Sequence, residues 1–245
     1  MVRISRFTVA VALAKSSMLA ISSTLAMSSV LAVSLAMSSA PALAQAAREQ
    51  PAPVKQAAKP ADAPIMDRET AIEKANAYLN GASTMVADFV QIAADGRRSE
   101  GKLYVQRPGR MRFEYARPAT LEIVADGTSV SIRDRKLATQ DLYFIKQTPL
   151  KFLLKSNIDL SKDVKVLKVE GDPKQITITV EDKATFGGTS RIKLIFDPKT
   201  FSLKQWHVTD PQGYETLVSL FNIDLGRKPD SNLFVINTER MLSPN

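Results

Sequence analysis

Few residues of this chain are of the types that perform catalysis or bind metals. His207 is the single histidine, within Gln205-Trp206-His207-Val208, and the chain has no cysteine. Nucleophilic catalysis needs a serine or thiol beside a base, and neither a G-x-S-x-G elbow nor a thiol is present. A zinc site needs closely spaced histidine and cysteine ligands, which are also absent. Asp95 and Asp126 stand beside glycine in turn-like contexts, and no pair of carboxylates is distinguished. We therefore expect no enzyme, no metal site and no cofactor.

The strongest pattern is an alternation of apolar and charged side chains after a break at Arg107-Pro108-Gly109. Successive side chains of a strand point to opposite faces, so alternation produces one apolar and one wet face. A second strand follows, and Asp126-Gly127 is a hairpin turn signal. The apolar set is Met111, Phe113, Tyr115, Leu121 and Ile123, and the polar set is Arg110, Arg112, Glu114, Thr120 and Glu122. The apolar face either fills a closed core or lines a binding cavity.

The elements that must position this face are mostly strands. One long helix is predicted to start at an Asp67 N-cap, bury Ile72, Ala75 and Leu79, and end at Asn80-Gly81. Pro- or Gly-containing turns separate the strands of the second half. Strand patterns cover residues 84–94, 99–106, 110–117, 119–125, 128–133, 137–144, 163–170, 175–182, 190–197, 202–209 and 214–223, with a short one near 233–237. So many antiparallel strands must curl or close, which predicts a mainly β fold: an incomplete antiparallel barrel of about eleven strands closed by helices.

A helical interruption between the two series of strands is the candidate lid. Thr148 is placed to cap it, Pro149 to occupy its first helical position, and four apolar residues follow. The predicted lid residues are Leu150, Phe152, Leu153 and Leu154. Arg107 lies at a strand break, where its guanidinium could donate to backbone carbonyls of such a lid or simply be solvated.

The first 44 residues have the order of an export signal. Arg3 and Arg6 precede a long Ala/Leu/Val/Met/Ser run, and Ala42-Leu43-Ala44 resembles a cleavage site. We expect 1–44 to be a signal peptide rather than an anchor, 45–65 an Ala/Pro-rich flexible linker, and 66–245 one half-barrel domain. Without cysteine, the exported protein has no disulfides and no lipidated N-terminal cysteine.

The charge of the chain is mildly basic. The net charge is +8, and removal of the first 44 residues, with three basic and no acidic residues, would leave +5. Such an excess suits an anionic membrane surface or an acidic partner, although an ordinary solvated surface explains it as well. The basic residues are scattered along strands and the chain is predicted to be exported, so we expect no nucleic-acid partner.

Several segments of the chain resemble the periplasmic LolA lipoprotein carriers, and the resemblance covers about residues 66–245. The Arg107–Tyr115 segment, RPGRMRFEY, is the most specific part. The other matching segments are Ala87–Gln91, Gly101–Val105, Asp126-Gly127, Thr148-Pro149-Leu150 with Leu153-Leu154, and Asp210–Thr216. The resemblance implies an incomplete barrel with a helical lid, in agreement with the strand pattern.

The resemblance also implies a function and a site. A member would accept acylated lipoproteins from an inner-membrane ABC-type release complex, cross the periplasm as a monomer, and deliver them to an outer-membrane acceptor. Arg107 matches the arginine that holds the lid closed. The implied acyl-chain cavity residues are Phe89, Leu103, Val105, Met111, Phe113, Tyr115, Leu121 and Ile123. The acceptor shares the fold but uses a lipidated cysteine, which this chain lacks, so the carrier is favoured.

Two other functions fit the same fold. One is a generic periplasmic carrier of hydrophobic ligands, which would bind free lipid without a release complex. The other is a lipid-sensing regulator, which would use the half-barrel to bind a partner protein. On the sequence alone, Arg107→Leu is expected to leave folding intact, weaken the closed lid, and make the open form hold its ligand more firmly.

Overall fold

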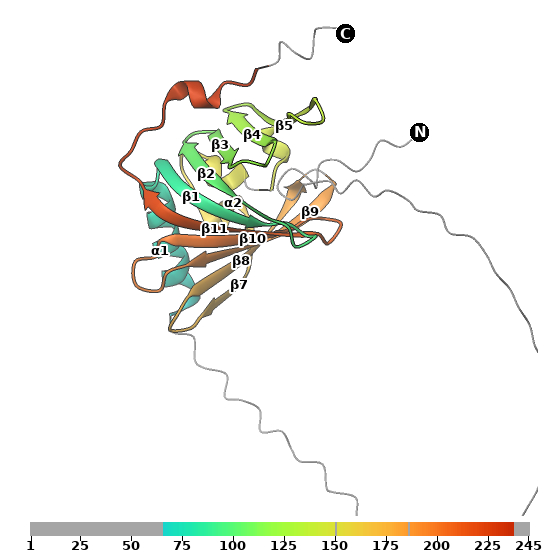
Figure 1. Cartoon of the computed structure of the whole chain (residues 1–245). Coiled ribbons are helices and arrows are strands. Elements are labelled where there is room, and N and C mark those ends of the chain that lie inside the picture. Colours follow the sequence, from blue (N-terminus) through green and yellow to red (C-terminus); the bar gives the residue numbers. More distant parts are fainter. Residues whose placement is uncertain (1–65, 150, 186, 238–245) are drawn as a thin grey trace, which may run out of the picture. The chain divides into compact units, whose positions relative to one another are not determined.

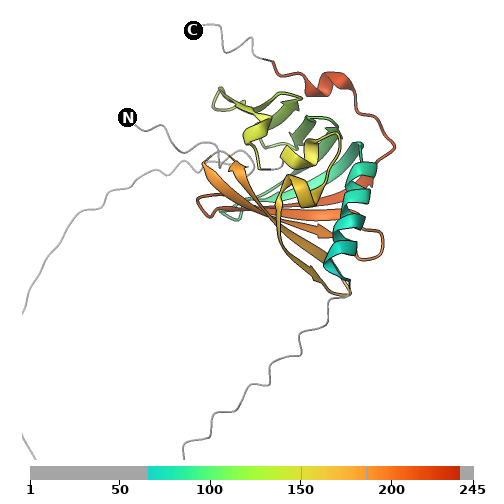
Figure 2. The same ribbon diagram turned by 180° about the vertical axis from the view of Figure 1, so that it is seen from behind.

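The computed structural model describes residues 66–149, 151–185 and 187–237, which form one curved antiparallel sheet covered by helices (Figures 1 and 2). Eleven strands pair in the order β6-β5-β4-β3-β2-β1-β11-β10-β9-β8-β7. Pairing of β1 with β11 joins the two halves of the chain, so β6 and β7 are the two edges. The strands are β1 Thr84–Ile92, β2 Arg98–Gln106, β3 Arg110–Tyr115, β4 Leu121–Asp126, β5 Ser129–Asp134, β6 Thr139–Phe144, β7 Lys165–Gly171, β8 Ile176–Thr185, β9 Gly188–Phe196, β10 Leu203–Thr209 and β11 Glu215–Asp224. This confirms the predicted fold class.

Helix α1, Arg68–Gly81, forms as its capping signals predicted. The Asp67 carboxylate accepts a hydrogen bond from the Thr70 backbone N–H at 2.9 Å, which satisfies one of the unpaired donors of the first turn. Ala71, Ile72, Ala75 and Leu79 are buried on the side that faces the sheet. The helix therefore covers part of the apolar face.

The segment between the edge strands supplies the remaining cover. It contains two 3-10 helices, η1 Ile145–Gln147 and η2 Lys151–Leu154, and a one-turn helix, α2 Leu160–Asp163. Because it connects β6 to β7, it crosses between the two unpaired edges (Figure 2). We call residues 145–149 and 151–163 the lid segment. We call the sheet face that packs against this segment and α1 the inner face.

The centre of the inner face is aromatic. The Phe89 ring makes edge-on contacts with Phe113 and Tyr115 at centroid distances of 5.0 and 5.1 Å. Gly101 lies between Phe89 and Tyr115 in the register of β1, β2 and β3, and a Cβ there would come within 2.0 Å of the Glu114 carbonyl oxygen. The glycine permits close approach of the strands, while the neighbouring rings cover the space it leaves.

Three local predictions were wrong. The last strand, near 233–237, is instead a 3-10 helix, η3 Ser231–Phe234, because the Asp230 carboxylate accepts from the Asn232 N–H at 2.9 Å and starts a helical turn. Thr148 does not cap the lid helix: its hydroxyl donates to the Ile145 carbonyl at 2.8 Å and closes η1. Pro149 likewise does not occupy the first position of this helix, because η2 begins at Lys151. The lid helix is correspondingly a short 3-10 turn.

Three predictions lie outside the described residues. These are the signal peptide 1–44, the linker 45–65 and the lid residue Leu150. The boundaries of the 66–245 domain likewise stay a prediction. Within the part of the chain that the structure describes, no helix is both long and apolar enough to cross a membrane.

Candidate functional site

The inner face gathers the predicted cavity residues into one apolar cluster. In the register, Phe113 lies opposite both Leu103 and Ile123, and Met111 lies opposite Val105. Phe89, Leu103, Phe113, Tyr115 and Ile123 are buried, and Val105, Met111 and Leu121 are partly buried against them. The structure thus brings all eight together, in a packed arrangement. Their contact with acyl chains stays a prediction.

The lid segment closes this cluster with apolar side chains of its own. Phe152 is 0% exposed and belongs to the same cluster, with Leu153 partly buried against it. Leu154 is also buried. Ile158 and Leu160, farther along the segment, are buried in the cluster too and were missed by the sequence reasoning. Apolar burial of this kind is not directional, so another apolar group could replace these contacts.

Arg107 joins the lid segment to the end of α1. Its Nη1 donates to the Lys155 carbonyl of the lid segment at 3.3 Å. Its Nε donates to the Ala82 carbonyl at 3.2 Å, and its Nη2 donates to the carbonyls of Asn80, at 3.1 Å, and Leu79. The C-terminal carbonyls of a helix lack intrahelical partners and carry negative partial charge, so a guanidinium suits this position. Desolvation lowers the pKa of Arg107, which remains charged because an arginine titrates far above neutral pH. Its role as a gate stays a prediction.

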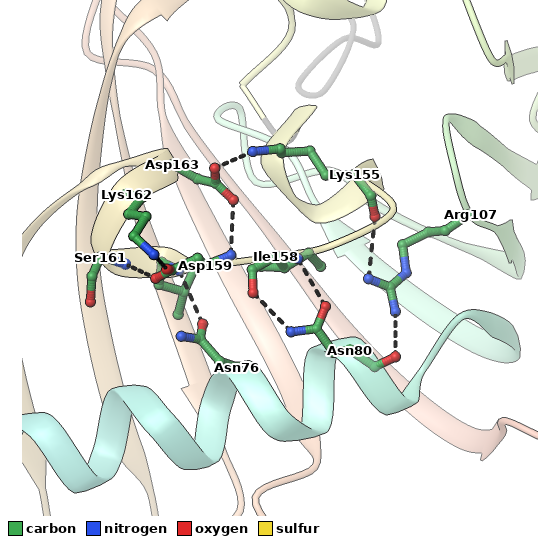
Figure 3. A network of polar contacts seen from close by, with 10 residues as sticks. Asn76, Asn80, Arg107, Lys155, Ile158, Asp159, Ser161, Lys162 and Asp163 are labelled. Carbon is green, nitrogen blue, oxygen red and sulfur yellow. Dashed lines mark hydrogen bonds and ion pairs between the residues drawn. The ribbon is translucent and has the colours of Figure 1, made fainter.

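Two asparagines of α1 hold the lid segment farther along (Figure 3). The Asn80 side-chain amide donates to the Ile158 carbonyl and its oxygen accepts from the Ile158 N–H, both at 2.8 Å. The Asn76 side-chain oxygen accepts from the Leu160 N–H at 3.0 Å. Residues 76 and 80 are four apart and share one helix face, so both reach the same stretch of backbone. We call this pair the asparagine clamp.

Charged side chains also bind the lid segment. Lys151 Nζ lies 2.7 Å from a carboxylate oxygen of Asp182, a residue of β8 that is almost fully buried. Asp182 lies on the same face of β8 as Ile178 and Val180, so its carboxylate borders the apolar cluster. Within the segment, Lys155 pairs with Asp163 (Figure 3). A buried carboxylate needs such a partner, so this ion pair holds Lys151 and the lid segment against β8.

The remaining candidates for chemistry do not form a site. His207 is half-buried, its Nε2 lies 2.7 Å from the Gln205 amide nitrogen, and burial lowers its pKa. It alternates with the inward Trp206 and Val208, which places it on the opposite face. Among the described residues, no group of three or more His, Asp or Glu side chains could hold a metal ion.

The asparagine clamp gives a graded test of lid opening. Asn80→Ala removes two hydrogen bonds to the lid backbone, so we expect opening to become easier by about 1–3 kcal/mol. Alanine is also the better helix former, so α1 itself should not weaken. Hydrogen exchange of the amides of Ile158 and Leu160 should therefore accelerate while exchange in β1 is unchanged.

Asn76→Ala is the matched control, because it removes one hydrogen bond to the same segment. Its effect should be smaller than that of Asn80→Ala. Equal exchange in the two variants and the unsubstituted protein would contradict the clamp.

The chain is similar in sequence to known proteins. The profile of the family described as outer membrane lipoprotein carrier protein LolA matches residues 80–237. An outer-membrane lipoprotein carrier protein from Legionella pneumophila is 32% identical over 177 residues, covering 69% of this chain and 86% of that protein. One from Chromobacterium violaceum is 39% identical over 72 residues, which are 28% of this chain and only 35% of that protein.

One solved structure is similar to part of the chain. A LolA superfamily protein from Nitrosomonas europaea has a TM-score of 0.41 and 10% identity, covering 70% of this chain and 98% of that one. The family profile spans more than half of the chain, from the end of α1 to the segment after η3. The chain therefore belongs to the LolA family of outer-membrane lipoprotein carrier proteins.

Proposed function

We propose that this protein is a periplasmic chaperone for acylated lipoproteins. It accepts them from an inner-membrane ABC-type release complex, shields their acyl chains on the inner face, and delivers them to an outer-membrane acceptor. In this proposal the protein acts as a monomer and catalyses no reaction. The observation that carries the proposal is the apolar inner face beneath a segment that bridges two unpaired sheet edges.

The energetics favour a covered carrier. Each acyl methylene kept out of water contributes about 0.8 kcal/mol, so an uncovered lipoprotein would not cross an aqueous compartment. The carrier must also release its ligand. Closure by Phe152 and by hydrogen bonds to backbone groups supplies free energy that opposes retention, because the ligand must displace these contacts to bind.

The test is release from spheroplasts that hold labelled lipoproteins. Purified mature protein is added, and the supernatant is analysed for soluble complexes. We expect one-to-one complexes that form only while the cells contain ATP. Serum albumin, a carrier of free lipid, is the control for non-specific extraction.

Two other outcomes would change the assignment. Binding of a fluorescent fatty acid without lipoprotein release would indicate a generic hydrophobic-ligand carrier. If the protein neither binds the fatty acid nor releases lipoproteins, transport is contradicted. A regulator that binds a partner protein would then be the favoured function.

A further inference from the structure

Three neighbouring buried polar atoms of the inner face have no hydrogen-bond partner among the described residues. They are the indole Nε1 of Trp206, a carboxylate oxygen of Asp210 and the hydroxyl of Thr216. These side chains are 4%, 7% and 1% exposed, respectively. Each such atom costs about 1–3 kcal/mol relative to a hydrogen-bonded one. Three of them on neighbouring strands therefore require an explanation.

The strand register places the three side chains together. Thr216 on β11 lies directly opposite Val208 on β10. Trp206 and Asp210 are two residues to either side of Val208, and alternation puts them on its face. The Asp210 N–H donates to the Tyr214 carbonyl at 3.0 Å, which extends the pairing one position beyond β10. Thr216 is consequently the diagonal neighbour of both, at a spacing of roughly 7–8 Å between backbones.

This polar group adjoins the aromatic cluster. The Trp206 ring contacts Phe113 edge-on at a centroid distance of 6.5 Å. On the other side of β11, Gln91 lies opposite Val218, and its side-chain oxygen accepts from the Tyr115 hydroxyl at 2.8 Å. The inner face thus passes from hydrocarbon surface to hydrogen-bonding groups within one or two residues.

The available chemistry differs from that of a site for hydrocarbon alone. The indole N–H is a donor only, and the hydroxyl both donates and accepts. The second oxygen of Asp210 accepts two backbone N–H groups, from Gln212 at 2.8 Å and Tyr214 at 2.9 Å, which leaves the first oxygen unused. Burial raises the pKa of Asp210, and the backbone N–H groups that donate to it oppose this shift. The indole N–H and the hydroxyl match the carbonyl oxygens of esters and amides, and the unused carboxylate oxygen matches an amide N–H.

We propose that Trp206, Thr216 and Asp210 form a polar subsite that hydrogen-bonds the ester and amide linkages by which acyl chains are joined to a lipoprotein. The inference rests on the proposed carrier function and adds a chemical discrimination to it. The aromatic cluster holds the chains, and the subsite recognises that they are linked rather than free.

The test compares two synthetic lipopeptides with equal chain lengths. One carries two ester-linked acyl chains on a glyceryl group that is attached to the sulfur of its cysteine. The other carries two ether-linked alkyl chains on the same group, so it lacks the carbonyl oxygens. Affinity is measured by displacement of a fluorescent fatty acid. The unsubstituted protein should bind the ester peptide about two- to tenfold more tightly, the range expected for a net hydrogen bond.

Thr216→Val keeps the shape of the side chain and removes its hydroxyl, so the ester preference should fall while affinity for the ether peptide is retained. Trp206→Phe, which removes the indole N–H and part of the ring but keeps an aromatic side chain, provides a second variant if the first folds poorly. Thr177→Val is the control, because Thr177 alternates with the buried Ile176 and Ile178 and so faces away from the inner face.

Equal affinity of the unsubstituted protein for both peptides would overturn the subsite and indicate that water alone occupies these groups. An ester preference that survives in both Thr216→Val and Trp206→Phe would overturn it as well. Failure to bind either peptide would overturn the carrier function itself, so the two failures are distinguishable.

Discussion

Replacing Arg107 by leucine is expected to slow delivery of lipoproteins to the acceptor at least tenfold and to lower the free energy of unfolding by about 2–4 kcal/mol. The first effect follows from the lost hydrogen bond to the Lys155 carbonyl, which weakens the closed lid. A carrier whose closed form is less stable releases its ligand less readily. The second effect follows from the end of α1, where the carbonyls of Leu79, Asn80 and Ala82 lose their donor.

The sequence alone predicts that this variant folds and has a weaker closed lid. The hydrogen bonds to the end of α1 add an expected loss of stability to that prediction. Because most hydrogen bonds of Arg107 go to the helix end, a folded protein with a loosened α1 is the more consistent outcome.

Delivery is measured with purified variant–lipoprotein complexes and outer-membrane fragments that carry the acceptor, and stability by urea unfolding. Arg98→Leu is the matched control, because Arg98 is an exposed arginine on β2 whose ion pair with Glu100 lies on the surface. Arg107→Lys should be intermediate, since an ammonium keeps the charge but cannot serve four carbonyls in one plane. Delivery by Arg107→Leu at the unsubstituted rate would rule out a role in release.

Periodic and local signals account for the parts of this protein that could be predicted. The alternation through Met111, Phe113 and Tyr115 identified the apolar face, because the period of a strand depends only on neighbouring residues. The helix α1 followed from its Asp67 cap and its apolar stripe. Turn residues set the approximate limits of the eleven strands.

The contacts that hold the lid segment could not be predicted in the same way. Asn80 and Ile158 are 78 residues apart, and Lys151 and Asp182 meet only because the lid segment crosses to β8. No local period encodes such pairs. The wrong strand prediction near 233–237 has a different cause. The apolar run 233–236 suits a strand or a helical turn equally, and the Asp230 cap favours the turn.

The loss of stability caused by Phe152→Ala should show whether the lid segment opens independently of the core. Removal of a fully buried phenylalanine from a core typically costs about 3–5 kcal/mol. Phe89→Ala should cost that full amount, because β1 is paired on both sides and cannot leave the sheet. Phe152→Ala should cost less if the lid segment opens on its own. Once the closed form is less stable than the open one, the protein stays open and the loss stops at the free energy of lid opening.

Urea unfolding of the two variants measures this difference, with the single tryptophan, Trp206, as a buried fluorescent probe. Binding of a fluorescent fatty acid should also respond in opposite directions. Phe152→Ala should bind more tightly, because ligand no longer has to displace the phenyl ring, whereas Phe89→Ala should not gain affinity. Leu153→Ala, which truncates a partly buried neighbour in the same turn, serves as the control and should give a smaller change. If Phe152→Ala and Phe89→Ala lose the same stability and neither gains affinity, Phe152 is part of a permanent core. The inner face would then be closed to acyl chains by packing rather than by a lid.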